Sequence, residues 1–375
     1  MEEFRELIPN PYIAGRPLRT DEMFFGREDV FQYIQDNLKG RFQNNIIILH
    51  GQRRTGKTSI LYQLLRRLGD EYVPVLVDMQ GITRGANYFF YDAALRIVEA
   101  LEGRDIFIDE PDRDDFEDEP EGYFRNRFLR QVRRNIGDKH LLLMIDEFEV
   151  IEEHIRRGIL DARLLYYLRH LMQHSPNLDF IFAGTHKIEE MAGDYWSVFF
   201  NIALYKKISF LDEMAVEQLI TQPVERYFKY DPLALIKIEQ ITGRHPYFTQ
   251  LFCHRLVNYR NKRRLNYINV QHVNDVIDQV MEEGEVNIAY IWQRSSLPEK
   301  LFLIALTKAI QLQGTVSALD VEKLLRQKKV RIDVSKVVKS LEVRDVIAIR
   351  NGQCEFTIDL FRHWVNENYD LEEYC

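Results

Sequence analysis

The sequence has few cysteines, no excess of positive charge and no long apolar run. Its three cysteines among 375 residues, Cys253, Cys354 and Cys375, lie far apart and lack the spacing of metal ligands. This argues against a disulfide framework and indicates reduced thiols inside a cell. The net charge of -8 argues against a protein that coats nucleic acid or membrane through bulk electrostatics, although it is compatible with a local basic patch.

The sequence also shows no pattern typical of a transmembrane helix or a signal peptide. No stretch approaches the roughly 18 uninterrupted apolar residues of a membrane helix, and residues 1–6 have neither a basic start nor an apolar core. We therefore expect a cytoplasmic protein with no membrane partner. No internal repeat stands out, which argues against a solenoid. With 46% apolar and 29% charged residues, the composition is globular, and the length allows two or three domains.

A phosphate-binding loop is the most informative motif that is present. Residues 51–58 read Gly-Gln-Arg-Arg-Thr-Gly-Lys-Thr, after an apolar run and before an amphipathic stretch. This order of strand, loop and helix directs backbone N–H groups and the positive end of the helix at phosphate oxygens. Lys57 should reach the β- and γ-phosphates, and the Thr58 hydroxyl should bind Mg²⁺. The predicted nucleotide contacts are Gly51, Gln52, Arg53, Arg54, Thr55, Gly56, Lys57, Thr58 and Ser59.

Five short apolar runs predict the strands of a largely parallel sheet. They span residues 46–50, 73–79, 141–146, 179–183 and 205–210 and alternate with longer amphipathic runs. Strands that are almost continuously apolar are typical of sheets covered on both faces. The predicted fold class is therefore α/β, a P-loop domain with a five-stranded, mostly parallel sheet.

The chain beyond residue 210 follows a different pattern. Amphipathic stretches predict helices at 211–222, 233–241, 245–258 and 270–281, which form an all-α lid. Three more, at 299–311, 318–327 and 334–343, precede two short strands joined by Asn351-Gly352, and this order predicts a winged helix. Asp359 is expected to cap a last helix at 360–368. The predicted domains are 1–210 (ATPase), 211–297 (lid) and 298–375 (winged helix).

An acidic stretch at residues 109–121 separates two predicted helices, at 88–101 and 123–136. Pro111 and Pro120 interrupt it, so we do not expect it to continue either helix. The composition favours a solvated surface excursion, and a partner-binding loop is the alternative.

Two acids follow the apolar run that ends at residue 146. A carboxylate at the end of a strand, beside the phosphate loop, can hold Mg²⁺ directly or through water, so we assign Asp146 to the metal. The next carboxylate can polarise the water that attacks the γ-phosphate, which makes Glu147 the expected general base. Lys57 completes the expected catalytic set.

Further candidates come from the fourth predicted strand and from arginines. Thr185, His186 and Lys187 follow that strand, where ligands of parallel sheets gather, so they are candidate sensors of the γ-phosphate. An ordinary turn with a solvent-facing lysine is an equal alternative. Four arginines after the acids could reach a neighbour's nucleotide, although solvated surface charges are the simpler reading: Arg156, Arg157, Arg163 and Arg169.

Two further motifs carry a family resemblance. Residues 24–28, Phe-Phe-Gly-Arg-Glu, resemble the box that borders the adenine pocket in signal-transduction ATPases with numerous domains (the STAND class) and in their AAA+ relatives, the origin-recognition initiators. Residues 243–247, Gly-Arg-His-Pro-Tyr, resemble the lid element whose proline packs near adenine. The resemblance adds Phe25, Gly26, Arg27, His245 and Pro246 to the expected nucleotide contacts. No Asn-Lys-x-Asp motif of guanine readers is present in the right place, which favours ATP over GTP by the same resemblance.

The resemblance implies a switch between ADP and ATP states. ADP would hold the lid and winged helix against the nucleotide domain, and ATP would permit opening and association with itself or a protein partner. Many STAND proteins place a histidine on the ADP phosphate from the winged helix, but the matching position here is Ile358, which cannot donate a hydrogen bond. An ADP lock would need another group, with His245 or His363 as candidates.

Three functions remain open from the sequence. The first is a slow, regulatory Mg²⁺-dependent ATPase whose output is a change of conformation. The second is a DNA-acting ATPase, since residues 299–350 carry eleven Lys/Arg against six Asp/Glu, with Lys336 and Lys339 on the expected recognition helix. The third, a protein that binds ATP without turnover, is disfavoured by the complete set of Lys57, Thr58 and the two acids.

Overall fold

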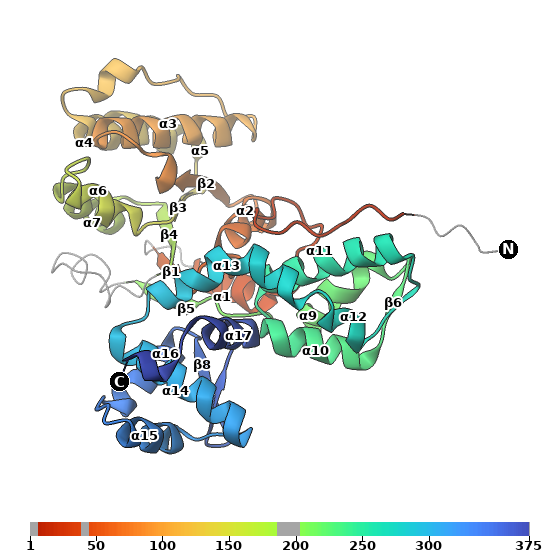
Figure 1. Ribbon diagram of the computed structural model, residues 1–375. Coiled ribbons are helices and arrows are strands. Elements are labelled where there is room, and N and C mark those ends of the chain that lie inside the picture. The colour runs from red at the N-terminus through yellow and green to blue at the C-terminus, as the bar shows by residue number, and fades with distance from the viewer. Residues whose placement is uncertain (1–6, 39–44, 186–202, 375) are drawn as a thin grey trace.

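A parallel sheet of five strands forms the centre of the first domain. The computed structural model describes residues 7–38, 45–185 and 203–374 (Figure 1). The strands are β1 (Ile46–His50), β2 (Tyr72–Asp78), β3 (His140–Asp146), β4 (Leu178–Gly184) and β5 (Leu204–Lys207). Their order is β2-β3-β4-β1-β5, and every neighbouring pair is parallel. This confirms the predicted five-stranded α/β fold.

The sheet is covered on both faces because alternate strand residues point in opposite directions. In β1, Ile47 and Leu49 join one buried cluster with α1 (Glu28–Leu38) and α2 (Lys57–Arg67). Ile46 and Ile48 join another. That second cluster is built mainly from α3 (Ala86–Glu102), α5 (Leu129–Ile136), α6 (Val150–Arg156) and α7 (Arg163–His174).

The connection between β2 and β3 is a long helical excursion at one end of the molecule (Figure 1). After the short turn η1 (Met79–Gly81) and α3, it contains η2 (Arg113–Phe116), α4 (Pro120–Tyr123), the π-helical η3 (Phe124–Phe128) and α5. The helix predicted at 123–136 is therefore interrupted by a π-helical stretch. Phe116 is buried and fixes the acidic stretch to the excursion's core.

The lid is helical apart from one very short strand pair. It contains α9 (Glu213–Thr221), η5 (Gln222–Val224), α10 (Pro232–Thr242), α11 (Pro246–Arg263), α12 (Val270–Asn274) and α13 (Ile277–Gln293). Strands β6 (Lys229–Tyr230) and β7 (Tyr267–Ile268) pair in parallel. The single helix predicted at 270–281 is wrong: α12 ends at Asn274, and α13 continues twelve residues past 281 to Gln293.

The last part of the chain consists of three helices, a hairpin and a final helix. They are α14 (Leu297–Gln313), α15 (Ala318–Gln327), α16 (Val334–Val343), β8 (Ile347–Arg350), β9 (Gln353–Phe356), α17 (Asp359–Asn368) and the turn η6 (Leu371–Tyr374). The prediction that Asp359 caps α17 is wrong, because Ile358 occupies the cap position. The Asp359 carboxylate instead accepts a hydrogen bond from Arg362 Nε at 2.5 Å.

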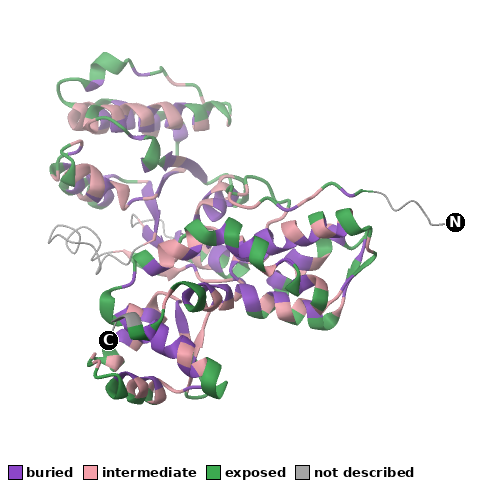
Figure 2. Cartoon of the chain, viewed as in Figure 1, coloured by how far each residue is buried: buried purple, intermediate pink, exposed green. Residues whose placement is uncertain are grey.

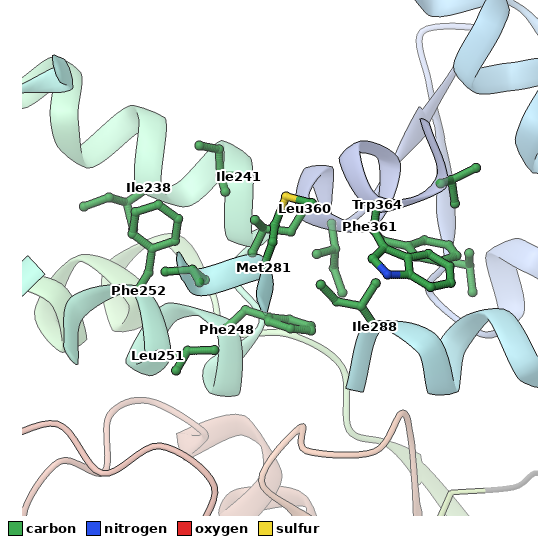
Figure 3. Close-up of a cluster of buried hydrophobic side chains, with 14 of the residues drawn as sticks. Ile238, Ile241, Phe248, Leu251, Phe252, Met281, Ile288, Leu360, Phe361 and Trp364 are labelled. Carbon is green, nitrogen blue, oxygen red and sulfur yellow. The ribbon is translucent and has the colours of Figure 1, made fainter. Parts of the chain in front are cut away.

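The lid and the last part of the chain share one hydrophobic core. Leu360, Phe361 and Trp364 of α17 lie beside Met281 and Ile288 of the lid (Figure 3). The core is continuous across the two regions, and its residues are purple in Figure 2. Separation of the two regions would expose this apolar surface to water, which is unfavourable.

An extended strap at residues 7–25 joins the lid to the nucleotide domain. Tyr12 is buried, and its hydroxyl donates to the Ile220 carbonyl at 2.7 Å in the lid. The Leu18 N–H donates to Ser59 Oγ at 2.9 Å on α2. Among the described residues, no single helix has the length and apolar composition of a membrane span, and the pair α14–α15 has them only when joined across a 105° bend.

Candidate nucleotide-binding site

The phosphate loop leaves the carboxyl end of β1 and enters α2 as predicted. Gly56 has a φ of 96° and precedes the first helical residue, a conformation that favours glycine. Within the part of the chain that the structure describes, no hydrogen bond uses the backbone N–H groups of residues 53–58. These donors and the positive end of α2 form a site for an anion.

Lys57 is buried and is held by the loop itself. Its Nζ donates to the carbonyls of Gly51 at 3.0 Å and Gln52 at 2.8 Å. Burial lowers the pKa of Lys57, and the nearby acids Glu147 and Asp146 oppose this shift. The amine is therefore positioned beside the loop, with carboxylates that favour its charged form.

Asp146 and Glu147 lie at the end of β3, across from the loop. The Asp146 carboxylate accepts a hydrogen bond from Thr58, and burial raises its pKa. Burial, followed by the neighbouring Glu149, raises the pKa of Glu147 to about 7. Glu147 also has a φ of 51°, which is rare for a residue with a side chain and is frequent at functional sites.

Glu149 is a site residue that sequence reasoning missed. Its Oε1 accepts from the Thr185 N–H at 2.9 Å and from the Thr185 hydroxyl at 2.6 Å. Gly184 permits this arrangement, because a Cβ there would overlap the Glu149 carboxylate and the Phe148 ring. The sequence contained one signal for Glu149: it is a third acid, two residues after Glu147.

Arg27 ties the loop to the start of the lid. Its Nη2 donates to the carbonyls of Thr55 at 3.0 Å and Ser209 at 2.8 Å, and Nη1 donates to Phe210 at 3.3 Å. Burial lowers the pKa of Arg27 to about 10. Gly26 lies close to the lid, where a Cβ would approach the Ala215 side chain to 2.6 Å. Residues 24–28 thus contact both the phosphate loop and the start of the lid.

The main cavity encloses about 310 Å³ between loop, lid and strap. Strap residues such as Arg16 and Leu18 line it, together with Asp78, Gln80 and Tyr247, none of which was predicted. The predicted residues that line it are Phe25, Arg27, Arg53, Arg54, Thr55, Gly56, Lys57, Thr58, Ser59, Asp146, Glu147 and Pro246. The site therefore has an acidic and a basic side around the loop, and an apolar side toward the strap.

A second cavity of about 80 Å³ lies on the other side of the phosphate loop. Gly51, Gln52, Thr185 and His245 line this cavity and not the main one. His245 is 2% exposed, and one of its ring nitrogens lies 3.2 Å from the Arg53 carbonyl. Burial lowers the pKa of His245 to about 3, so the ring is neutral at pH 7.

The C-terminal region closes this second cavity. Gln52 Nε2 donates to the Arg344 carbonyl at 2.5 Å, and Lys207 Nζ pairs with Asp345 at 2.6 Å. Arg53 lies over the Tyr290 ring of α13, 5.3 Å from its centroid. Consecutive residues of the phosphate loop thus contact the C-terminal region and the lid.

The remaining predicted residues lie elsewhere. None of the four arginine candidates lines either cavity, and Arg163 pairs with Asp161 of its own chain at 3.0 Å. His363 lies 3.2 Å from the Asp359 carboxylate and lines neither cavity. His186 and Lys187, two of the candidate sensors, lie outside the described residues.

The donors at the loop fit a magnesium ion held mainly by oxygen atoms. Thr58 and Asp146 supply a hydroxyl and a carboxylate, and Mg²⁺ commonly takes one or two protein ligands with phosphate oxygens and water. No group of three or more His, Cys, Asp or Glu side chains in the described ranges could hold a metal without such help. The free N–H groups of residues 53–58 fit the phosphates that would complete the site.

Comparisons with known proteins agree with this geometry. Residues 37–192 match the family described as AAA domain. An uncharacterized ATP-binding protein of Pyrococcus horikoshii, PH0541, is 22% identical over 333 residues, which are 81% of this chain and 100% of that protein. The Walker-type ATPase PABY2304 of Pyrococcus abyssi has a similar fold, with a TM-score of 0.61, 15% identity and coverage of 94% of this chain and 98% of that one.

Origin-recognition proteins are similar to this chain at a lower level. Cdc6p from Pyrobaculum aerophilum aligns over 95% of this chain and 98% of its own, with 14% identity and a TM-score of 0.48. A score at this level supports no conclusion about function. The family match over residues 37–192, the parallel sheet and the loop geometry make the first part of the chain similar to an AAA-type P-loop ATPase domain.

Proposed function

We propose that the protein is a slow, Mg²⁺-dependent ATPase of the STAND type, in which the bound nucleotide controls the docking of a C-terminal winged helix. The observation that carries the proposal is the hydrogen bond from Gln52 of the phosphate loop to the Arg344 carbonyl. A loop that contacts phosphate on one side and the C-terminal region on the other can couple the two events.

The residues of the main cavity would have separate roles in hydrolysis. Lys57 and the N–H groups of the loop bind phosphate, and Thr58 with Asp146 holds the magnesium ion, which neutralises developing charge. Glu147 orients and deprotonates the attacking water. We expect slow turnover in a single chain, since none of the four candidates for an arginine finger lines the cavity and such a finger contributes much of the rate in related chemistry.

Release of the C-terminal region is the proposed output. Two polar contacts hold it to the first domain: Gln52 of the phosphate loop with Arg344, and Lys207 at the end of β5 with Asp345. Exposed or half-exposed pairs of this kind contribute about 1 kcal/mol or less each, so a modest difference in nucleotide affinity between the two conformations can shift the equilibrium. The opened chain would then associate with another copy or with a protein partner.

Binding of duplex DNA is the second candidate function. The third helix of the C-terminal region, α16, carries the exposed Lys336 and Lys339, and exposed Lys329 and Arg331 precede it. Basic side chains on such a helix can contact phosphates in a major groove. DNA binding with a steep negative salt dependence that Lys336→Glu with Lys339→Glu abolishes would favour this function. No binding at low salt would exclude it.

The decisive experiment measures the nucleotide and the molar mass together. The nucleotide that co-purifies is identified, and the mass is determined with ADP and with a slowly hydrolysed ATP analogue. A molar mass that is higher with the ATP analogue than with ADP supports the switch. A mass that does not depend on nucleotide, together with turnover stimulated by DNA, would contradict the switch and support the second function.

A further inference from the structure

The excursion between β2 and β3 carries two opposite charges side by side. The acidic segment, residues 109–121, has nine Asp or Glu residues and one Arg. The arginine segment, residues 122–137, follows it directly and has five Arg residues and no acid. In a chain with a net charge of -8, the second segment is a local reversal of sign.

The two charged segments do not neutralise each other within one chain. No ion pair in the described ranges joins any of the five arginines to an acid, although other helices of the same domain contain such pairs, for example Arg96 with Asp92 at 2.6 Å. The acidic segment makes local contacts instead, such as Asp109 with Gln131 at 3.2 Å. Both sets of charges are therefore available to a partner.

The arginine segment presents its charges on one face of a firmly packed helix. Arg127, Arg130 and Arg134 are exposed and lie three and four residues apart, which places them on one side of the helix. Phe124 and Phe128 of the same segment are buried. The charged face is thus held in place by the core and needs no ordering before it binds.

The acidic segment is equally exposed. Asp114, Glu117 and Asp118 are open to solvent, while Phe116 between them is buried. Phe107, just before the acidic segment, is 71% exposed and offers an apolar contact at the same end of the molecule. Figure 1 shows this end far from the C-terminal region, and Figure 2 shows the exposed segment there in green.

We propose that this excursion is a self-association surface, on which the acidic segment of one copy contacts the arginine segment of a second copy. A patch with both signs next to each other is complementary to itself under a two-fold rotation. Arginine suits this role because its planar fork binds carboxylates in a bidentate manner. A nucleic acid fits less well, since nine carboxylates beside the arginines would repel its phosphates.

The proposal does not depend on the nucleotide switch. None of the charged residues of the two segments lines the main cavity, so association through this surface should be the same in the parent and in Lys57→Ala. Failure of the switch would leave this association intact. Loss of this association would leave nucleotide binding intact.

The test is a charge exchange between two variants of the full chain. One carries Arg127→Glu, Arg130→Glu and Arg134→Glu; the other carries Asp114→Lys, Glu117→Lys and Asp118→Lys. Molar mass is measured by light scattering at concentrations up to roughly 100 μM, with circular dichroism as the control for folding. Arg226→Glu with Lys229→Glu and Lys262→Glu, three exposed residues of the lid, serves as a matched change of charge away from the surface.

The parent and the control should associate at low salt, with an association constant that falls at least about tenfold between roughly 50 and 500 mM salt. Each exchanged variant alone should be monomeric, and an equimolar mixture should regain association. A monomeric parent at low salt, or exchanged variants that associate as the parent does, would overturn the proposal. So would a monomeric parent that binds nucleic acid through the three arginines.

Discussion

The two sides of the phosphate loop differ in size, in chemistry and in what covers them. The main cavity, about 310 Å³, contains the lysine, the hydroxyl and the two acids of nucleotide chemistry. The second cavity, about 80 Å³, is closed by α13 and by residues 343–346 of the C-terminal region. The difference teaches that one short loop has two contrasting sides: its unbonded N–H groups offer a site for an anion, and Gln52 donates a hydrogen bond to the C-terminal region.

The largest effect is expected on the side of the main cavity, from Lys57→Ala. If the buried Lys57 ammonium binds two phosphates as proposed, its loss should weaken nucleotide binding by about 100-fold or more, because hydrogen bonds to charged groups contribute roughly 1.5–3 kcal/mol each. Calorimetric titration with ADP measures the change, and Lys336→Ala is the control for loss of one lysine. Equal affinities of Lys57→Ala and the parent would refute the assignment of the main cavity.

Glu147→Gln, in the same main cavity, should distinguish ATP binding from ATP hydrolysis. Turnover should fall by about 100-fold or more, the usual contribution of a general base, while ATP affinity is retained because the side-chain shape is kept. Steady-state hydrolysis and nucleotide titration give the two quantities. Glu117→Gln, on the exposed acidic segment, is the matched control, and equal turnover by Glu147→Gln and the parent would exclude Glu147 as the base.

On the side of the second cavity, His245 should make the free energy of unfolding depend on pH. The folded-state pKa is about 3, below the ordinary value of about 6.5, so the unfolded chain binds the proton more readily. At a pH above about 6.5, the pKa of His245 in the unfolded chain, the histidine has no effect on stability. As the pH falls from about 6.5 toward 3, the unfolded chain takes up the proton and the folded state is destabilised. Between pH 7 and 5.5 the parent should lose roughly 1 kcal/mol more unfolding free energy than His245→Asn. Urea unfolding of both chains measures this, and parallel losses would contradict a neutral buried histidine.

The smallest effect is expected from Asp345→Ala, which removes the partner of Lys207. The pair is partly exposed, with side-chain exposures of 36% and 16%, so its contribution is about 1 kcal/mol or less. Release of bound ADP should accelerate by roughly two- to fivefold, the range that such an energy permits. Stopped-flow release of a fluorescent ADP analogue measures the rate. Glu355→Ala, whose carboxylate lies 3.7 Å from Arg350 on the hairpin, is the control.

Local patterns in the sequence predicted the parallel sheet of the first domain. Apolar runs predicted all five strands, and β1 spans the predicted residues, with the phosphate loop directly after its last residue. The loop, Asp146 and Glu147 could be predicted because their chemistry requires fixed spacing beside a strand. Where a helix was broken, as between α12 and α13, tertiary packing overrode a continuous amphipathic pattern.

Contacts between distant segments could not be predicted. The hydrogen bond from Gln52 to Arg344 joins residues 292 positions apart, and no pattern in either segment specifies the other. His245 was predicted at the nucleotide from a motif, but its distance to Arg53 and the second cavity place it behind the loop. Whether Thr185, held by Glu149, senses phosphate stays a prediction.

The strap at residues 7–25 limits how far the lid can travel. Ile13 is bonded to Gln250 of the lid, and Leu18 to Ser59 of α2. The chain between these anchors can span at most about 18 Å when fully extended. The chain that follows β5 is the second connection between the nucleotide domain and the lid, so the lid is tethered at two points. If the lid moves as proposed, the two tethers would restrict it to a rotation about the line that joins them, and a wider opening would require one of the strap's hydrogen bonds to break first.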